Sequence, residues 1–200
     1  GGWSLSRDAH WCMPVAAPVY PKIGILGSGS IGSRIKKMAE AMGMQAHFLE
    51  NPRRSYEDDG KERVSFERAL KALGLNYIVL CCPLSDDSMS IIDNDFFDLI
   101  PAEMRGKVSL INVARGPVVN EAHLLKALAD GILRRAYHDV LQAEPPESME
   151  AYEDMMQAGK LFITPHIAWT AAISDVATVA MTNLQAFLSN GRGMDVNRVC

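Results

Sequence analysis

Short apolar runs and amphipathic stretches alternate along most of the chain. The apolar runs predict strands, and the stretches with apolar residues every three or four positions predict helices. Runs such as YIVLCC and VSLINVA are continuously apolar, which is typical of strands covered on both faces of a parallel sheet. The alternation therefore predicts an α/β fold with right-handed crossovers. The expected strands are 22–26, 45–49, 77–82, 108–112, 134–139 and 161–164, and the expected helices are 31–42, 64–73, 94–99, 121–130 and 171–189.

The stretch KIGILGSGSIG at 22–32 joins the first expected strand to the first expected helix. Gly27, Gly29 and Gly32 have the spacing G-x-G-x-x-G. The first glycine of such a turn allows the bend, the second lets the backbone approach a pyrophosphate, and the third lets helix and strand pack closely. The helix N-terminus then faces the negative charge. Glu50 follows at about the 20-residue offset where an acid binds a ribose, so we interpret this stretch as a dinucleotide site rather than an ordinary glycine-rich loop.

These observations divide the chain into three expected parts. Residues 22–190 form a Rossmann-type domain, a doubly wound parallel sheet in a three-layer α/β/α arrangement. Residues 1–21 have little periodicity but carry two tryptophans, so we expect an arm that packs on a second subunit. Residues 191–200 form a C-terminal tail. The segment 142–159, rich in Glu, Met and Pro, is interpreted as a long surface loop.

Composition limits the partners. The formal net charge is −4 and the pI is about 5.7, which gives no reason to expect nucleic acid or an anionic membrane. No apolar run reaches the length of a membrane span and no signal peptide is visible, so we expect a cytoplasmic protein. The four cysteines include no C-x-x-C pair, which argues against a disulfide framework or a zinc site, and we expect no metal.

Candidate chemical groups follow three of the expected strands. Arg115 lies in INVARGP, Asp139 and Glu144 lie in DVLQAEPP, and His166 lies in TPHIAW. Each alone has an ordinary structural interpretation, such as a surface arginine, a solvated glutamate or a hydrogen-bonded histidine. Ligands of such sheets bind at the carboxyl ends of the strands, where these groups would meet. Together they supply a guanidinium that can bind a carboxylate with two hydrogen bonds, an imidazole for proton transfer and an acid to orient that imidazole.

The order and wording of these motifs resemble the cofactor-binding domain of the D-2-hydroxyacid dehydrogenase family. The similarity runs from about Trp3 to Val196, and the opening arm and the HIAW wording look most like glycerate dehydrogenases, which reduce hydroxypyruvate. The matching segments are GSGSIG at 27–32, Glu50, CCPLSDDS at 81–88, NVARGPVVNE at 112–121, HDVLQAEP at 138–145 and TPHIAW at 164–169.

The resemblance implies a catalytic trio. Arg115 would bind the substrate carboxylate and polarise its carbonyl, His166 would protonate the carbonyl oxygen during reduction, and Glu144 would hydrogen-bond the imidazole and keep its acid form available near neutral pH. It also implies that the residues at the cofactor are Gly27, Gly29, Ser30, Ile31, Gly32, Glu50, Pro83, Ser88, Val113, Ala114, Arg115, Asp139 and His166.

The cofactor preference is open to two interpretations. Glu50 would repel a 2′-phosphate and favours NAD, whereas Arg53 and Arg54 could accept that phosphate and bind NADP. We expect NAD. Family members often carry an acid where this chain has Gln142, and we expect little consequence from that difference.

The resemblance also implies a substrate domain, built mostly from residues that precede the cofactor domain. We expect that domain to be absent from this chain and the isolated chain to turn over poorly. We also expect a homodimer through the cofactor domain. One other function stays open, a dinucleotide-sensing corepressor, which retains the same trio on the same fold. A formate dehydrogenase is a third interpretation, and Glu144 argues against it because that branch carries glutamine at this position.

Overall fold

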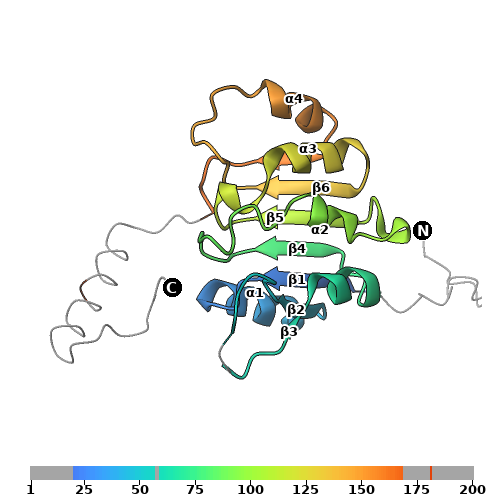
Figure 1. Cartoon of the computed structure of the whole chain (residues 1–200), viewed down its shortest axis with the longest axis vertical. Helices are drawn as coiled ribbons and strands as arrows, with labels where there is room; N and C mark the ends of the chain where they lie inside the picture. The colour runs from blue at the N-terminus through green and yellow to red at the C-terminus, as the bar shows by residue number, and fades with distance from the viewer. Residues whose placement is uncertain (1–19, 57–58, 169–180, 182–200) are drawn as a thin grey trace, which may run out of the picture.

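A seven-stranded parallel sheet runs through the centre of the molecule (Figure 1). The structure is a computed structural model and describes residues 20–56, 59–168 and Met181. The strand order is β3-β2-β1-β4-β5-β6-β7. The chain therefore moves from β1 outward in one direction and returns to β4 on the other side of β1, which makes the carboxyl ends of β1 and β4 the expected binding crevice. The strands are β1 (Lys22–Leu26), β2 (Gln45–Leu49), β3 (Arg63–Val64), β4 (Tyr77–Leu80), β5 (Val108–Asn112), β6 (Leu133–His138) and β7 (Leu161–Ile163).

Among the described residues, helices cover the two faces of this sheet unequally. On one face, α1 packs over β1 and β2 around a small core that includes Ile25 and Phe48. On the other face, the remaining helices enclose the main core, which includes Leu80, Phe97 and Leu110. The helices are α1 (Ser30–Ala41), the π-helical turn η1 (Arg68–Ala72), α2 (Asn94–Asp98), the 3-10 turns η2 (Ala102–Met104) and η3 (Gly116–Val118), α3 (Glu121–Ala129) and α4 (Glu150–Gln157).

On β5, β6 and β7, apolar side chains form a strip that no helix in the described part of the chain covers. Ile111, Tyr137 and Phe162 lie directly beside one another on β5, β6 and β7, so their side chains project from the same face of the sheet, the one that carries α1. The rings of Tyr137 and Phe162 stack with centroids 5.0 Å apart, and Phe162 is still 44% exposed. We call Ile111, Tyr137 and Phe162 the open strip.

The predicted α/β fold is confirmed, and the six predicted strands all form with ends that differ by at most two residues. The predicted helix 64–73 is wrong at its start. Val64 instead belongs to β3 and pairs with Leu49 of β2, and the carbonyl of Val64 accepts the N–H of Glu50. Pairing at the edge of the sheet therefore determines the structure here, although the sequence pattern is helical.

The interpretation of 142–159 as a surface loop is also wrong. The segment contains α4, whose Tyr152 and Met155 pack against the main core. These two residues are three positions apart, which places them on one side of a helix that carries three acidic residues at its other positions. The arm before Tyr20, the predicted helix 171–189 apart from Met181, and the tail 191–200 lie outside the described residues. Within the residues that are described, no helix is long and apolar enough to cross a membrane.

Candidate active site

The glycine turn after β1 is shaped by contacts that exclude side chains at two of its three glycines. Gly27 has φ +117, and a Cβ on it would lie 2.8 Å from the backbone of Cys81. A Cβ on Gly32 would lie 1.9 Å from the carbonyl oxygen of Gly27. A Cβ on Gly29, by contrast, would meet nothing within 4 Å. Packing within the protein therefore explains the first and third glycines, and it leaves the space beside the second one free for a ligand.

The start of α1 faces the same space. Gly29 is its N-cap and supplies no side-chain cap, and the first turn carries no acidic residue. Ser30 is exposed, and Ile31 is 44% exposed. The first N–H groups of a helix have no partner inside the helix, and together with the helix dipole they form an anion site. A dinucleotide pyrophosphate fits this turn, because the backbone donors are open and no Cβ blocks the approach at Gly29.

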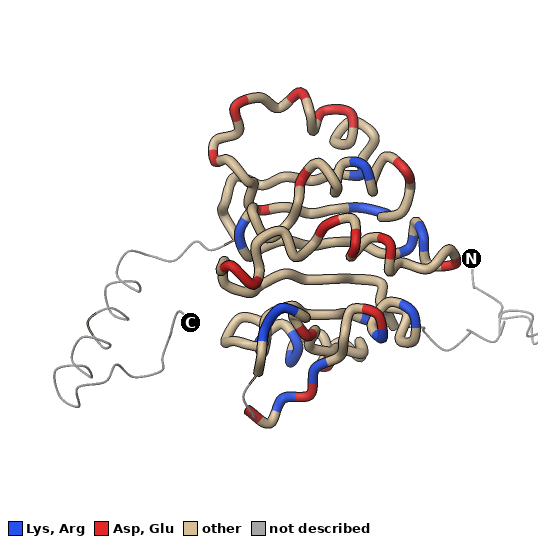
Figure 2. Tube along the Cα trace, viewed as in Figure 1, with Lys and Arg blue, Asp and Glu red and all other residues tan. Residues whose placement is uncertain are grey.

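Several cations gather near the predicted ribose end. Figure 2 shows the basic segments of the stretch between β2 and β3. Lys61 Nζ donates to the carbonyl of Ser28 at 2.6 Å, and Arg63 Nη2 donates to the Ser28 hydroxyl at 2.7 Å. Both cations thus contact the glycine turn itself, which the sequence analysis did not predict. Lys61 and Arg63 flank an acidic residue immediately before β3, and no motif in the sequence marks them as neighbours of the turn.

Glu50, the predicted ribose acid, and the nearby Arg53 differ in how far the protein already engages their side chains. Glu50 follows β2 directly and is exposed. Arg53 Nη1 donates to the carbonyl of Met89 at 2.8 Å, and its other nitrogen lies 3.9 Å from Asp93. Arg53 is therefore already engaged by the protein, whereas the carboxylate of Glu50 makes no hydrogen bond within the described residues.

The loop after β4 holds the predicted cofactor residues Pro83 and Ser88. Ser88 is buried, and its hydroxyl donates to the carbonyl of Pro83 at 2.8 Å and accepts the N–H of Ser85 at 2.8 Å. This hydroxyl shapes the loop. The contact of Ser88 with a cofactor stays a prediction.

The turn after β5 is organised by a residue that the sequence analysis did not single out. Asn112 is fully buried, and its side chain accepts the N–H of Ala114 at 3.0 Å and donates to the carbonyl of Arg115 at 3.1 Å. The N–H of Val113 donates to Leu80, which keeps the turn attached to β4. Asn112 therefore fixes the backbone from which the exposed Arg115 side chain extends. The position of Asn112 at the end of a buried strand is the signal for this role.

Glu144 and His166 form the central pair of the site. Glu144 Oε2 lies 2.7 Å from His166 Nδ1. The hydrogen bond from His166 lowers the pKa of Glu144 although burial opposes it, and the N–H of Leu141 and the charge of Arg115 lower it further. Glu144 and His166, which are 22 residues apart in the sequence, are thus in direct contact, and the charge of Arg115 acts on the same carboxylate. The contact of the His166 imidazole with a substrate stays a prediction.

Asp139 holds the turn that carries the imidazole. His166 has φ +52, a left-handed backbone that is uncommon outside glycine. Its N–H donates to the carbonyls of Asp139 and Thr164. The Asp139 carboxylate accepts the Thr164 hydroxyl and the N–H groups of Ile167 and Ala168. Burial raises the pKa of Asp139, but these hydrogen bonds outweigh it and the net pKa is lowered. Its predicted contact with the nicotinamide end stays a prediction.

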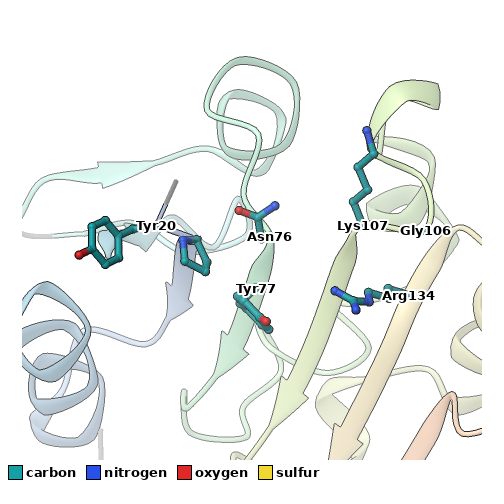
Figure 3. A pocket seen from close by; sticks show the side chains of 7 residues that line it. Tyr20, Asn76, Tyr77, Gly106, Lys107 and Arg134 are labelled. Atoms are coloured by element: carbon teal, nitrogen blue, oxygen red, sulfur yellow. The ribbon is translucent and has the colours of Figure 1, made fainter. Parts of the chain in front are cut away.

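Two cavities lie at opposite edges of the sheet. One, of about 280 Å³, lies at the carboxyl ends of β5 to β7 beside Asp139, Ile167 and the open strip. The other, of about 350 Å³, lies at the amino ends of β4 to β6 and is lined by Tyr77, Lys107 and Arg134 among others (Figure 3). Because the strands are parallel, the second cavity is on the far edge from the Glu144–His166 pair and plays no part in that site. No cluster of three or more metal-ligating side chains occurs among the residues that the structure describes.

Comparison with known proteins gives one consistent family. The profile of the D-isomer specific 2-hydroxyacid dehydrogenase NAD binding domain matches residues 7–168. The chain is 31% identical over 192 residues to the glyoxylate/hydroxypyruvate reductase HPR3 of Arabidopsis thaliana, covering 95% of this chain and 55% of that protein. It is 32% identical over 192 residues to the glycerate dehydrogenase of Methylorubrum extorquens, covering 94% and 57%. The chain thus spans about half the length of the curated relatives it matches.

Solved structures agree. A D-isomer specific 2-hydroxyacid dehydrogenase from Xanthobacter autotrophicus Py2, in complex with NADPH and MES, superposes with a TM-score of 0.70 at 26% identity. That match covers 90% of this chain and 71% of the other. The D-lactate dehydrogenase of Lactobacillus jensenii with NAD+ gives a TM-score of 0.68 at 25% identity, covering 86% and 53%. Relatives with both dinucleotides therefore share this fold.

Proposed function

Because the chain belongs to the D-isomer specific 2-hydroxyacid dehydrogenase family, as an NAD-binding domain, we propose that its protein interconverts a small D-2-hydroxy acid and its 2-oxo acid. The favoured pair is glycerate and hydroxypyruvate, since relatives carry the names glycerate dehydrogenase and hydroxypyruvate reductase. The observation that carries this proposal is the 2.7 Å contact between Glu144 and His166 beside Arg115.

Each member of the trio has a role that its chemistry allows. The guanidinium of Arg115 would bind the substrate carboxylate with its planar fork and draw electron density from the adjacent carbonyl. His166 would donate a proton from Nε2 to the carbonyl oxygen during reduction and take it back during oxidation. Glu144, at Nδ1, would fix the tautomer and the orientation of the ring. The nicotinamide supplies the hydride when it is bound.

The dinucleotide site favours NADH in this proposal. The uncapped start of α1 and the open space at Gly29 would hold the pyrophosphate. Glu50 would accept hydrogen bonds from the ribose and repel a 2′-phosphate. Arg53 is already bound to Met89, which weakens the case for NADP, while Lys61 and Arg63 lie at the turn and support a general preference for anions.

The activity belongs to the whole protein in this proposal. Residues 22–190 would bind the dinucleotide, and a second domain would close over the substrate and exclude water. We further propose a homodimer through the cofactor domain, with residues 1–21 as its arm. The open strip supports this, because an exposed apolar surface of this kind marks a contact site. Sedimentation of the protein as a monomer would contradict the dimer.

The direct test is a panel of 2-oxo acids with NADH and NADPH on the complete gene product. We expect hydroxypyruvate and glyoxylate to be reduced, with NADH preferred. Absence of turnover with every oxo acid, together with NADH-dependent binding to a protein partner, would instead assign the corepressor type of function.

A further inference from the structure

Glu121 lies outside the catalytic trio, yet two short hydrogen bonds connect it to the loop that carries Glu144. It is the first residue of α3 and only 7% exposed. Its Oε1 accepts the N–H of Gln142 and its Oε2 accepts the hydroxyl of Tyr152, each at 2.6 Å. No lysine, arginine or histidine pairs with it in the described parts of the chain. The two donors and the positive end of the helix dipole therefore stabilise its charge.

The residue before Gln142 in the loop holds the carboxylate of Glu144. The N–H of Leu141 donates to Glu144 Oε1 at 2.8 Å, while Glu144 Oε2 contacts His166. Both oxygens of Glu144 are thus fixed, one by the loop backbone and one by the imidazole. The loop also presses against η3, since a Cβ on Gly116 would lie 1.9 Å from the carbonyl oxygen of Leu141. A shift of the loop would therefore move Glu144 and its contact with His166.

The other oxygen of Glu121 is held by α4. Tyr152 projects from α4 toward the N-terminus of α3, and these two helices pack together. Burial raises the pKa of Tyr152 to about 12, and the hydrogen bond to Glu121 adds to the effect, so the hydroxyl keeps its proton over the physiological range. The Gln142 side chain adds a bond to the carbonyl of Val119 at 3.1 Å. The loop is accordingly held by α3, and α3 by α4.

We propose that Glu121 is a positioning residue for the acid–base pair: it holds the backbone at Gln142, which sets the carboxylate of Glu144 and through it the ring of His166, while Tyr152 orients Glu121. Its role in catalysis rests on the proposed dehydrogenase function. The hydrogen-bonded link itself does not, and it can be measured in this 200-residue chain without substrate.

The first test compares Glu121→Ala with Glu153→Gln. Glu153 is an exposed residue of α4 whose side chain makes no hydrogen bond in the described structure, so its variant removes the same charge without touching the link. We expect amide hydrogen exchange at Gln142 and Leu141 to be at least about tenfold faster in Glu121→Ala and unchanged in the control. We also expect carbon-detected NMR to show the pKa of Glu144 rising toward its ordinary value. Unchanged exchange and titration would overturn the inference.

Two milder variants cover the case in which Glu121→Ala does not fold. Glu121→Gln keeps an oxygen for the N–H of Gln142, and Tyr152→Phe removes only the hydroxyl. We expect exchange at Gln142 to rise by about threefold in each, less than with alanine. Glutamine gives the N–H of Gln142 a neutral acceptor, and hydrogen bonds to charged groups are about twice as strong as neutral ones; phenylalanine removes the bond that orients Glu121. A conservative variant with no rise in exchange at this loop would refute the link.

Activity of the complete protein provides the second readout. We expect Glu121→Ala to lower kcat by about tenfold while KM for NADH stays within about twofold, because the change acts on proton transfer and not on dinucleotide binding. A wild-type protein that reduces no oxo acid but shows the link would refute the dehydrogenase proposal and hence the catalytic role. A variant with full kcat in an active enzyme would refute the positioning role alone.

Discussion

The site has a nucleotide end, at the glycine turn, and an acid–base end, at Glu144 and His166. The two ends are formed by different parts of the polypeptide: backbone at the first and side chains at the second. At the nucleotide end, the shape is set by missing side chains, because Gly27 and Gly32 leave room only for backbone. At the acid–base end, the shape is set by side-chain hydrogen bonds that join distant segments, as between Glu144 and His166. The glycines of the first end lie within six consecutive residues that pack against the end of β4, whereas the side chains of the second end come from separate segments of the chain. A substitution should therefore change packing at one end and proton transfer at the other.

The largest expected effect is at the imidazole. His166→Asn removes the proton donor, yet asparagine tolerates the left-handed backbone at φ +52. We expect oxo-acid reduction by the complete protein to fall by about 10²–10⁴-fold. NADH affinity, measured by fluorescence titration, should stay within about threefold, because the pyrophosphate contacts lie at the other end. A comparable loss of NADH affinity would remove the distinction between the two ends.

The next effect concerns a buried histidine below the acid–base end. His138 in β6 is 2% exposed, and its Nε2 has no hydrogen-bond partner in the described structure. Burial lowers the pKa of His138 from 6.5 to about 4. The unfolded chain therefore binds the proton first as the pH falls, so stability declines from about pH 6.5 down to about pH 4. From the size of the shift, the decline attributable to His138 is about 3 kcal/mol.

The matched variant is His138→Leu, which keeps an apolar side chain in the core. We expect its free energy of unfolding, from urea titrations, to be flatter than that of the wild type between pH 4 and pH 6.5. At pH 7, His138 is neutral in both the folded and the unfolded wild-type chain, so the free energies of unfolding of the two proteins should differ least there. Parallel curves over the whole range would show that His138 does not make this end of the sheet sensitive to acid.

The third effect separates two glycines of the same turn. Gly32→Ala places a methyl group 1.9 Å from the carbonyl oxygen of Gly27, so we expect it to destabilise the chain by at least about 1–3 kcal/mol. Gly29→Ala meets nothing within 4 Å and should leave the free energy of unfolding within about 1 kcal/mol. It should weaken NADH binding nonetheless, because the added methyl occupies the expected path of the phosphates. Equal destabilisation by both variants would mean that packing explains Gly29 as well.

The same contrast explains what the sequence could predict. The strands and the glycine turn were accessible because apolar runs and glycine spacing are local signals, and the ends of strands pointed to the segments that carry Glu144 and His166. The link from Glu121 to Gln142 and Tyr152 was not accessible, because one partner is a backbone N–H and the other lies on α4, in a segment that the sequence analysis interpreted as a loop. Helix α4 was missed because only two of its residues face the core, so its apolar pattern is too short to outweigh its charge.

The smallest expected effect is the cofactor preference, which tests whether charge contributes at the nucleotide end beside backbone shape. Glu50→Gln removes the exposed carboxylate that would repel a 2′-phosphate, while Lys61 and Arg63 stay at the glycine turn. We expect the ratio of NADPH to NADH affinity to rise by no more than about fivefold, because exposed charges interact weakly in water. The rise should shrink at high salt, which screens the repulsion that remains in the wild type. Arg53→Gln is the comparison variant, and because this arginine is already bound to Met89 we expect it to change the ratio less than Glu50→Gln does. A larger change with Arg53→Gln, or an unchanged ratio with Glu50→Gln, would show that the carboxylate after β2 does not set the preference.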